Sequence, residues 1–126
     1  MELKAPIIVI KYISKAESIG YNRKFTALKN MKIVYLQIGY EDGLPIQMMG
    51  TKIVLYKGNI LKIIGKVSMD LVAVDFTGID VKIGEWVTLF GGNKNRLEVI
   101  CSKTNSNPYV ILTGIGNRVI REYIND

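Results

Sequence analysis

The sequence predicts a small, mainly β domain, with a β-barrel or Greek-key-like arrangement and one or two short helices near the C-terminus. Short runs rich in isoleucine, valine and tyrosine recur along the 126-residue chain, and glycine, asparagine or proline interrupts most of them after a few residues. Many short strands at close spacing with little helix are typical of a β-barrel or a β-sandwich. At this length we expect one domain that covers residues 1–126.

Apolar residues predict the strands of the first half of the chain. We expect strands over Pro6–Ile13, Phe25–Leu28 and Met31–Ile38. A polar turn over Ser14–Ser18 and a polar corner over Tyr21–Lys24 separate the first two of these strands. After the third, Asp-Gly followed by proline within Glu41–Pro45 predicts a tight turn.

A hairpin and a long central strand follow. Lys52–Tyr56 and Ile60–Ile64 flank Lys57-Gly58-Asn59, where glycine supplies the positive φ that a hairpin turn requires. From Ile63 onward, apolar residues or glycine recur at every second position, and Lys66, Ser68 and Asp70 lie between them on the other face. This pattern predicts one continuous strand through Asp75, half-exposed at first and buried on both faces toward its end.

The last third of the chain predicts a loop over Thr77–Gly84 and a strand over Glu85–Phe90, in which Trp86 and Phe90 are expected in the core. Helical and strand patterns both fit Arg96–Lys103. A helix with Asn107 as its cap and Pro108 in its first turn should follow, and glycine should end it before a last strand over Asn117–Ile124.

The composition excludes several classes of protein. The chain has no histidine and a single cysteine, which rules out Ser-His and Cys-His catalytic pairs, an internal disulfide and a plausible zinc site. No apolar run reaches membrane-spanning length, and the N-terminus lacks a secretion pattern, so we expect a cytoplasmic protein. The net charge of +6 suits nucleic acid, a small anion or an acidic partner domain.

Several segments match one protein family in the family's order. They are Leu3-Lys4-Ala5, Glu17-Ser18-Ile19-Gly20-Tyr21, Phe25-Thr26-Ala27, Gly39-Tyr40-x-Asp42-Gly43, Gly65-x-Val67-x-Met69-Asp70, Val74-Asp75-x-Thr77, Val87-x-Leu89-Phe90-Gly91, Tyr109 and Arg118-Val119-x-Arg121. On these segments the chain resembles the C-terminal domain of alanine racemase, a pyridoxal-phosphate enzyme that interconverts L- and D-alanine. Related racemases share part of the pattern, so serine remains an alternative substrate.

The resemblance implies that the chemistry is shared with other parts of the enzyme. In the family, an N-terminal barrel carries the lysine that forms a Schiff base with pyridoxal phosphate, and no segment of these 126 residues matches that barrel. We therefore expect pyridoxal phosphate in the complete enzyme, none bound to this chain alone, and an isolated chain without activity. The implied partners are the barrel, a second subunit of a homodimer and a small amino acid, with no nucleic acid and no membrane.

The resemblance also implies roles for single residues. Tyr21 matches the catalytic tyrosine that moves the α-proton on one face of the substrate. Tyr40 would narrow the substrate corridor, Met69 would contact the substrate carboxylate through its backbone N–H, Asp70 would line the entry, and Tyr109 would bind the cofactor phosphate. The sequence departs from the family at Asn22, Ile46, Lys66 and Val110, where glycine, arginine, arginine and glutamate are usual.

Each role has a structural alternative. Tyr21 can instead cap a strand corner, and Met69 lies on the apolar face of the expected strand, where it would fill the core as readily as it would bind substrate. For Asp42 we expect a role in the turn. Arg118 and Arg121 more plausibly pair with carboxylates than contact substrate.

Two further functions stay open on the sequence alone. Tyr12, Tyr35 and Tyr56 lie beside lysines, which would suit a basic β-barrel that stacks the bases of RNA or single-stranded DNA. No aromatic-basic motif of such a module is present. A fragment that associates with a racemase without catalysing would have the same sequence features as a catalytic domain.

Overall fold

The computed structural model describes residues 2–19, 25–42, 44, 48, 50–65, 67–104, 111 and 115. Its strands are β1 (Leu3–Ile13), β2 (Ser18–Ile19), β3 (Phe25–Thr26), β4 (Met31–Leu36), β5 (Lys52–Tyr56), β6 (Asn59–Ile64), β7 (Val72–Asp75) and β8 (Trp86–Phe90). Two helices lie wholly within the described residues, the short 3₁₀-helix η2 (Tyr40–Asp42) and the α-helix α1 (Leu97–Thr104). The predicted alternative of a helix over Arg96–Lys103 is therefore confirmed, and the strand alternative is wrong.

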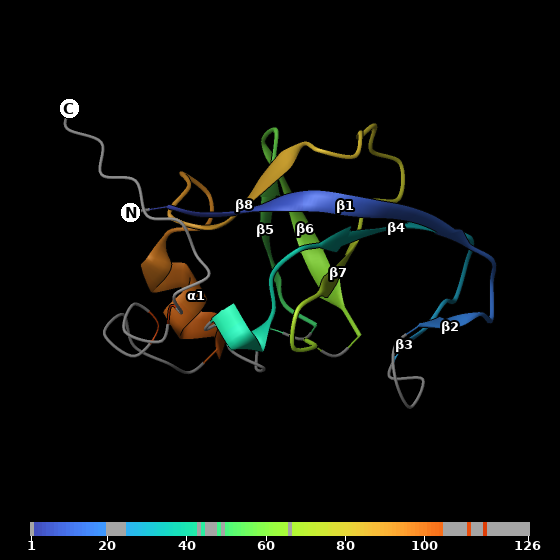
Figure 1. Cartoon of the computed structure of the whole chain (residues 1–126), viewed down its shortest axis with the longest axis horizontal. Helices are drawn as coiled ribbons and strands as arrows, with labels where there is room; N and C mark the ends of the chain where they lie inside the picture. Colours follow the sequence, from blue (N-terminus) through green and yellow to red (C-terminus); the bar gives the residue numbers. More distant parts are fainter. Residues whose placement is uncertain are drawn as a thin grey trace.

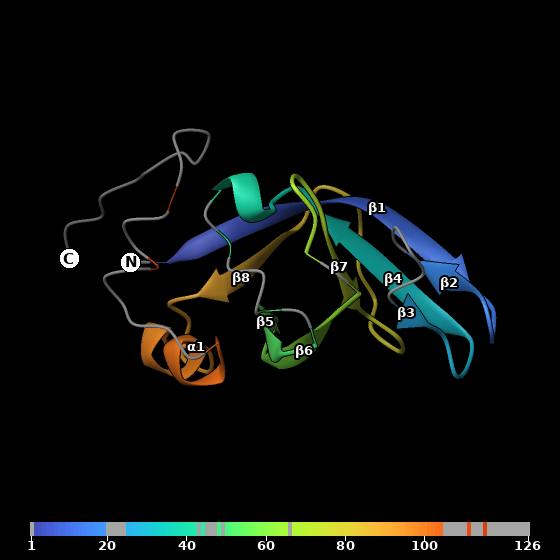
Figure 2. The same ribbon diagram turned by 90° about the horizontal axis from the view of Figure 1, so that it is seen from below.

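Six of the described strands close into an antiparallel barrel in the order β1-β4-β7-β6-β5-β8. The mainly β barrel predicted from the sequence is confirmed. In Figures 1 and 2 the α1 helix lies at one end of the long axis and the β2–β3 pair at the other, with the barrel between them. In the described part of the chain, no helix combines the length and apolar character needed to cross a membrane.

The long strand β1 contributes side chains to two apolar clusters, because a β-bulge reverses which of its faces points into the barrel. Leu3, Ala5 and Ile7 point into the main core inside the barrel. The pairing of β1 with β4 shifts between Ile7 and Val9, which inserts one extra residue into β1. Side chains alternate with a period of two, so the insertion turns Ile13 to the outer face of the barrel.

That outer face carries a second, smaller apolar cluster. It contains the buried residues Ile13, Ala27, Met31, Ile33, Ile64 and Ala73, with Phe25 and Tyr35 packed against it. Phe25 and Ala27 come from the segment that holds β3, and the other members come from β1, β4, β6 and β7. The β2–β3 pair is therefore held on the outside of the barrel by apolar packing.

The predicted hairpin is confirmed. Tyr56 pairs with Asn59, and the two residues between them, Lys57 and Gly58, have φ values of 44° and 81°. Positive φ at both central positions is the signature of the two-residue turn that matches the twist of an antiparallel pair. The predicted loop over Thr77–Gly84 also contains no strand or helix.

The prediction of a continuous central strand through Asp75 is wrong. β6 ends at Ile64, β7 begins at Val72, and a loop separates them. Gly65 leaves the extended conformation with a φ of 66°, so the chain turns where the alternation of side chains suggested that it continued. The apolar residues of the expected strand consequently differ in burial: Val67 is buried, whereas Met69 is 46% exposed.

The prediction that Trp86 lies in the core is also wrong. Phe90 lies in the core as predicted, but Trp86 is 59% exposed. In β8 the side chains of Val87 and Leu89 point inward, so the alternation directs Trp86, opposite Pro6 of β1, to the outside.

Asn95 closes the barrel between β5 and β8, where the paired residues are Leu55 and Thr88. Its side chain is fully buried, and its Nδ2 group donates hydrogen bonds of 2.8 Å to the carbonyl oxygens of both Ile53 and Thr88. Its Oδ1 accepts a hydrogen bond from the Gly92 N–H. One amide therefore bridges β5 and β8 at this seam, beside their single registered pair. The sequence pattern did not single out Asn95.

Candidate active-site surface

The loop between β6 and β7 contains two of the predicted site residues, Met69 and Asp70. Ser68 forms its turn, because the Ser68 hydroxyl donates to the Leu71 carbonyl at 2.7 Å and accepts from the Leu71 N–H at 3.2 Å. A backbone bond from Ser68 N–H to the same carbonyl adds a third tie. Met69 and Asp70 lie at the tip of this turn and are both exposed. The core alternative for Met69 is therefore wrong.

The 3₁₀-helix η2 carries Tyr40, and Asp42 forms its turn. Asp42 is buried, and its Oδ2 accepts a hydrogen bond of 3.1 Å from the Gly39 N–H. Its own N–H donates to the Gly39 carbonyl at 3.0 Å. These two bonds confirm that Asp42 builds the turn. Tyr40 is 44% exposed beside it.

These two turns lie against each other. Tyr40 N–H donates to the Ser68 carbonyl at 3.0 Å, and Glu41 N–H donates to the Met69 carbonyl at 3.1 Å. A Cβ atom on Gly39 would lie 2.2 Å from the Ser68 oxygen and 2.4 Å from the Met69 oxygen. Only glycine permits this approach, which gives the Gly39-Tyr40 part of the motif a physical reason. Residues 39–42 and 67–71 thus form one surface at the end of the barrel where β4 ends and β7 begins (Figures 1 and 2).

Tyr21, which was predicted to be the catalytic base, lies outside the described residues, as do Asn22 and Arg23. The residues on either side of it are described. Ile19 pairs with Phe25, Ser18 pairs with Thr26, and the hydroxyls of Ser18 and Thr26 are 3.2 Å apart. The second apolar cluster fixes this pair on the barrel, and burial against the cluster raises the pKa of Tyr35.

Further hydrogen bonds join residues 14–17 to Ala27, next to the β2–β3 pair. Ala16 N–H donates to the Ala27 carbonyl at 2.8 Å, and Ala27 N–H donates to the Glu17 carbonyl at 2.9 Å. The Glu17 side chain accepts from Ser14 N–H at 3.0 Å. Both ends of the stretch that contains Tyr21 are therefore anchored.

The described surface lacks the positively charged side chains that a phosphate group would need. Segments 39–42 and 67–71 contain three carboxylates, from Glu41, Asp42 and Asp70, and no lysine or arginine. A phosphate needs cations or clustered N–H donors. These two segments therefore supply no cation that would bind the cofactor phosphate. Tyr109, which was predicted to contact it, lies outside the described residues, as do Ile46, Lys66, Val110, Arg118 and Arg121.

The structure does not favour the nucleic-acid alternative. Of the three tyrosines that suggested base stacking, Tyr12 is exposed, Tyr35 is partly buried and Tyr56 is buried. The Tyr56 ring packs against Phe76, and its hydroxyl donates to the Glu85 carboxylate. The three rings therefore form no common stacking surface.

Comparison with known proteins supports the resemblance. Residues 1–123 match the family model "Alanine racemase, C-terminal domain". The chain is 39% identical over 119 residues to an alanine racemase of Vesicomyosocius okutanii, and the match covers 94% of this chain and 34% of that protein. It is 34% identical to a putative alanine racemase 2 of Schizosaccharomyces pombe, with 98% and 33% covered.

Solved structures give the same result. An alanine racemase from Bartonella henselae with covalently bound pyridoxal phosphate superposes with a TM-score of 0.91 and 34% identity over 98% of this chain and 34% of that one. The biosynthetic alanine racemase of Pseudomonas aeruginosa gives 0.90 and 28%, with 98% and 35% covered. The chain spans about a third of the length of these relatives. With nearly its whole length matched and its barrel shared, this chain belongs to the family of alanine racemase C-terminal domains.

Proposed function

We propose that this domain supplies one half of the active site of an alanine racemase. It would act with a pyridoxal-phosphate barrel, in a homodimer where the barrel of the partner subunit completes the site. The observation that carries the proposal is the match of residues 1–123 to the family, together with the surface that joins Tyr40 to Met69. The isolated domain would have no activity because the cofactor lysine belongs to the barrel.

Racemisation of an amino acid requires a proton to leave one face of Cα and another to arrive on the opposite face. Two bases on opposite sides meet this requirement. Pyridoxal phosphate, when bound, would make the Cα hydrogen acidic enough to be removed. We assign the base on one face to the Tyr21 oxygen, and the base on the other face to the barrel.

Tyr21 needs help to act as a base. An ordinary tyrosine with a pKa of about 10 is only ~0.1% ionised at neutral pH, a handicap of ~4 kcal/mol. Cations from the barrel, or Arg23 two residues away, would have to lower the pKa of Tyr21 and so reduce this energetic cost. The anchored ends of its segment support this role, because a base must be held within hydrogen-bond reach of the proton it moves.

Met69 and Tyr40 would bind and select the substrate. Within the part of the chain that the structure describes, the Met69 N–H donates to no backbone oxygen, whereas its carbonyl is occupied by Glu41. This leaves the N–H of an exposed turn available to a carboxylate group. Tyr40 stands beside it and would exclude long side chains, which favours small amino acids over large ones. Asp70, at the tip of the same turn, would line the entry.

A domain exchange tests the proposal. The chain would replace the C-terminal third of the Bartonella henselae enzyme, with which it shares its fold over nearly its whole length. Conversion of L- to D-alanine would be followed by chiral chromatography. We expect activity from the fusion, none from the isolated chain, and a loss of about 10²- to 10⁴-fold for Tyr21→Phe.

Tyr12→Phe provides the matched control, because Tyr12 is an exposed tyrosine of β1 outside the proposed site. It should keep the rate of the unmodified fusion. A near-normal rate for Tyr21→Phe would remove Tyr21 from the mechanism. Racemisation by the isolated chain would show that the barrel is not needed.

A further inference from the structure

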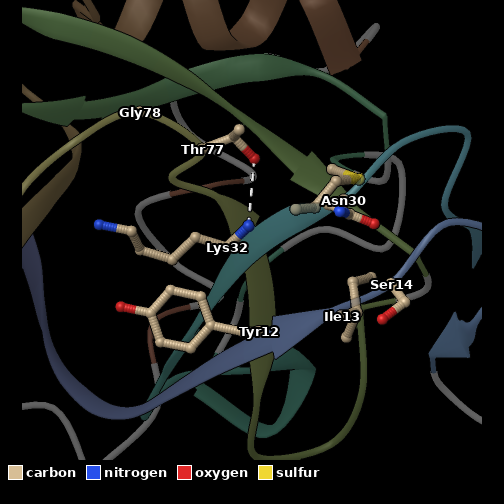
Figure 3. Close-up of a pocket in the computed structure, with 8 residues that line it drawn as sticks. Tyr12, Ile13, Ser14, Asn30, Lys32, Thr77 and Gly78 are labelled. Atoms are coloured by element: carbon tan, nitrogen blue, oxygen red, sulfur yellow. Dashed lines mark hydrogen bonds between the residues drawn. The ribbon is translucent and has the colours of Figure 1, made fainter.

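A groove lies near the end of the barrel opposite the candidate active-site surface. It has a volume of about 430 Å³ and is lined by Tyr12, Ser14, Asn30, Lys32, Thr77 and Gly78, among others (Figure 3). Strand β7 separates the two places: its first residue follows the loop of Met69, and its last precedes Thr77 by two residues. The volume lies within the ~300–1,000 Å³ of small-molecule sites.

Lys32 provides a positioned cation in this groove. Its backbone N–H donates to the Thr77 hydroxyl at 3.2 Å, and its carbonyl accepts from Phe76 N–H at 2.9 Å. Its ammonium group is partly buried and donates to the Ile79 carbonyl. The strand and the following loop thus hold this side chain at both its base and its tip.

The Lys32 ammonium has no carboxylate partner among the described residues, because their ion pairs are Lys4–Glu2 and Lys57–Glu85. The residues that line the groove include no aspartate or glutamate. The nearby Asp75 carboxylate forms no ion pair with Lys32 among the described residues, and its Oδ1 atom accepts both the N–H and the hydroxyl of Thr77. An ammonium group has three donors, and one of them is used by Ile79. The lining of the groove therefore carries a cation and no carboxylate, which favours an anion there.

The other groups of the groove add a flat apolar surface and further donors. Tyr12 is 74% exposed, and its ring lies beside the Lys32 side chain in Figure 3. The Asn30 Oδ1 accepts a hydrogen bond from Lys15 N–H at 3.0 Å. The Nδ2 group of Asn30 is therefore the part of this side chain that could donate a hydrogen bond to a ligand. The Ser14 hydroxyl lies at the same end as Asn30.

We infer that this groove binds a small organic anion with a flat ring, whose carboxylate or phosphate group contacts Lys32 while the ring packs on Tyr12. This is a second site, at a distance from the residues proposed for racemisation, and it does not depend on that proposal. A bound anion would tie the β1 and β4 ends of the barrel to the loop that follows β7.

Nuclear magnetic resonance titration of the ¹⁵N-labelled 126-residue chain tests the inference. Phenyl phosphate, inorganic phosphate and benzyl alcohol would be the probes. Phenyl phosphate should bind most tightly and shift the amide signals of Lys32, Thr77 and Gly78. Inorganic phosphate should bind more weakly at the same residues, and benzyl alcohol should not bind measurably.

Three variants identify the contacts. Lys32→Met should weaken phenyl phosphate by about tenfold or more, the loss expected for a charge-assisted hydrogen bond. Lys29→Met, which removes an exposed lysine outside the groove lining, should leave the affinity unchanged. Tyr12→Ala should weaken phenyl phosphate and leave inorganic phosphate unaffected.

Equal binding of benzyl alcohol and phenyl phosphate would overturn the inference, as would equal losses in Lys29→Met and Lys32→Met. Should Lys32→Met fail to fold, the Tyr12→Ala comparison decides: the inference is wrong if both probes keep their wild-type affinities there. Absence of binding by all three probes would also end it.

Discussion

Gly39→Ala is the sharpest test of how the candidate surface is built. The new methyl group would lie 2.2 Å from the Ser68 oxygen and 2.4 Å from the Met69 oxygen, and both are backbone atoms that cannot rotate away. The turn of residues 39–42 must therefore move off the loop of residues 67–71. This movement breaks the hydrogen bonds from Tyr40 N–H to Ser68 and from Glu41 N–H to Met69.

The expected cost follows from these contacts. Two backbone hydrogen bonds contribute ~0.5–1.5 kcal/mol each, and forcing an extra methyl group into a packed site costs ~1–3 kcal/mol. The free energy of unfolding should therefore fall by about 2–6 kcal/mol. With a urea dependence of about 1–3 kcal/mol per molar, the midpoint of urea unfolding should drop by about 1 M or more.

Circular dichroism in urea would measure the loss, and the methyl signal of Met69 would report on the surface. Gly58→Ala is the matched control, because it makes the same substitution at a glycine where a Cβ atom would meet nothing within 4 Å. Its φ of 81° alone should cost ~1–2 kcal/mol and leave Met69 unperturbed. The reasoning fails if Gly39→Ala is no more destabilising than Gly58→Ala and keeps the wild-type Met69 signal.

Two further predictions concern the barrel itself. Asn95→Ala leaves the Ile53 and Thr88 carbonyls and the Gly92 N–H without their partner, so unfolding free energy should fall by about 2–4 kcal/mol in urea titrations, whereas the exposed neighbour Asn93→Ala should change it little. Equal effects would refute the role of Asn95 at the seam. The hydrogen bond from Tyr56 holds the pKa of Glu85 below its ordinary value. Its carboxylate therefore contributes stability that is present above the unfolded pKa of about 4.3 and is lost as pH falls through the folded pKa. Glu85→Gln should flatten the decline in melting temperature below that pH, and an unchanged slope would contradict it.

The sequence by itself determined the local structure and the family. The hairpin at Lys57-Gly58 was predictable locally, because Gly58 adopts a positive φ at little cost and lies between two apolar runs. The loop after Asp75 also followed from local patterns, whereas for residues 96–103 the sequence left helix and strand open and the structure decided for a helix over residues 97–104. The ordered motifs identified the racemase domain because they are spread over the whole chain. None of these inferences required a contact between distant residues.

Tertiary structure alone decided the geometry of the site. The alternation of residues 63–75 satisfied a strand, and the break at Gly65 became visible only once β6 and β7 were seen to pair as separate strands of the barrel. Which face of β8 points inward is set by its register with β1, so the sequence could not place Trp86 outside. The meeting of Gly39 with Ser68 and the closure of the seam by Asn95 are contacts between residues far apart in the chain. Such contacts arise from closing the barrel, and no local periodicity records them.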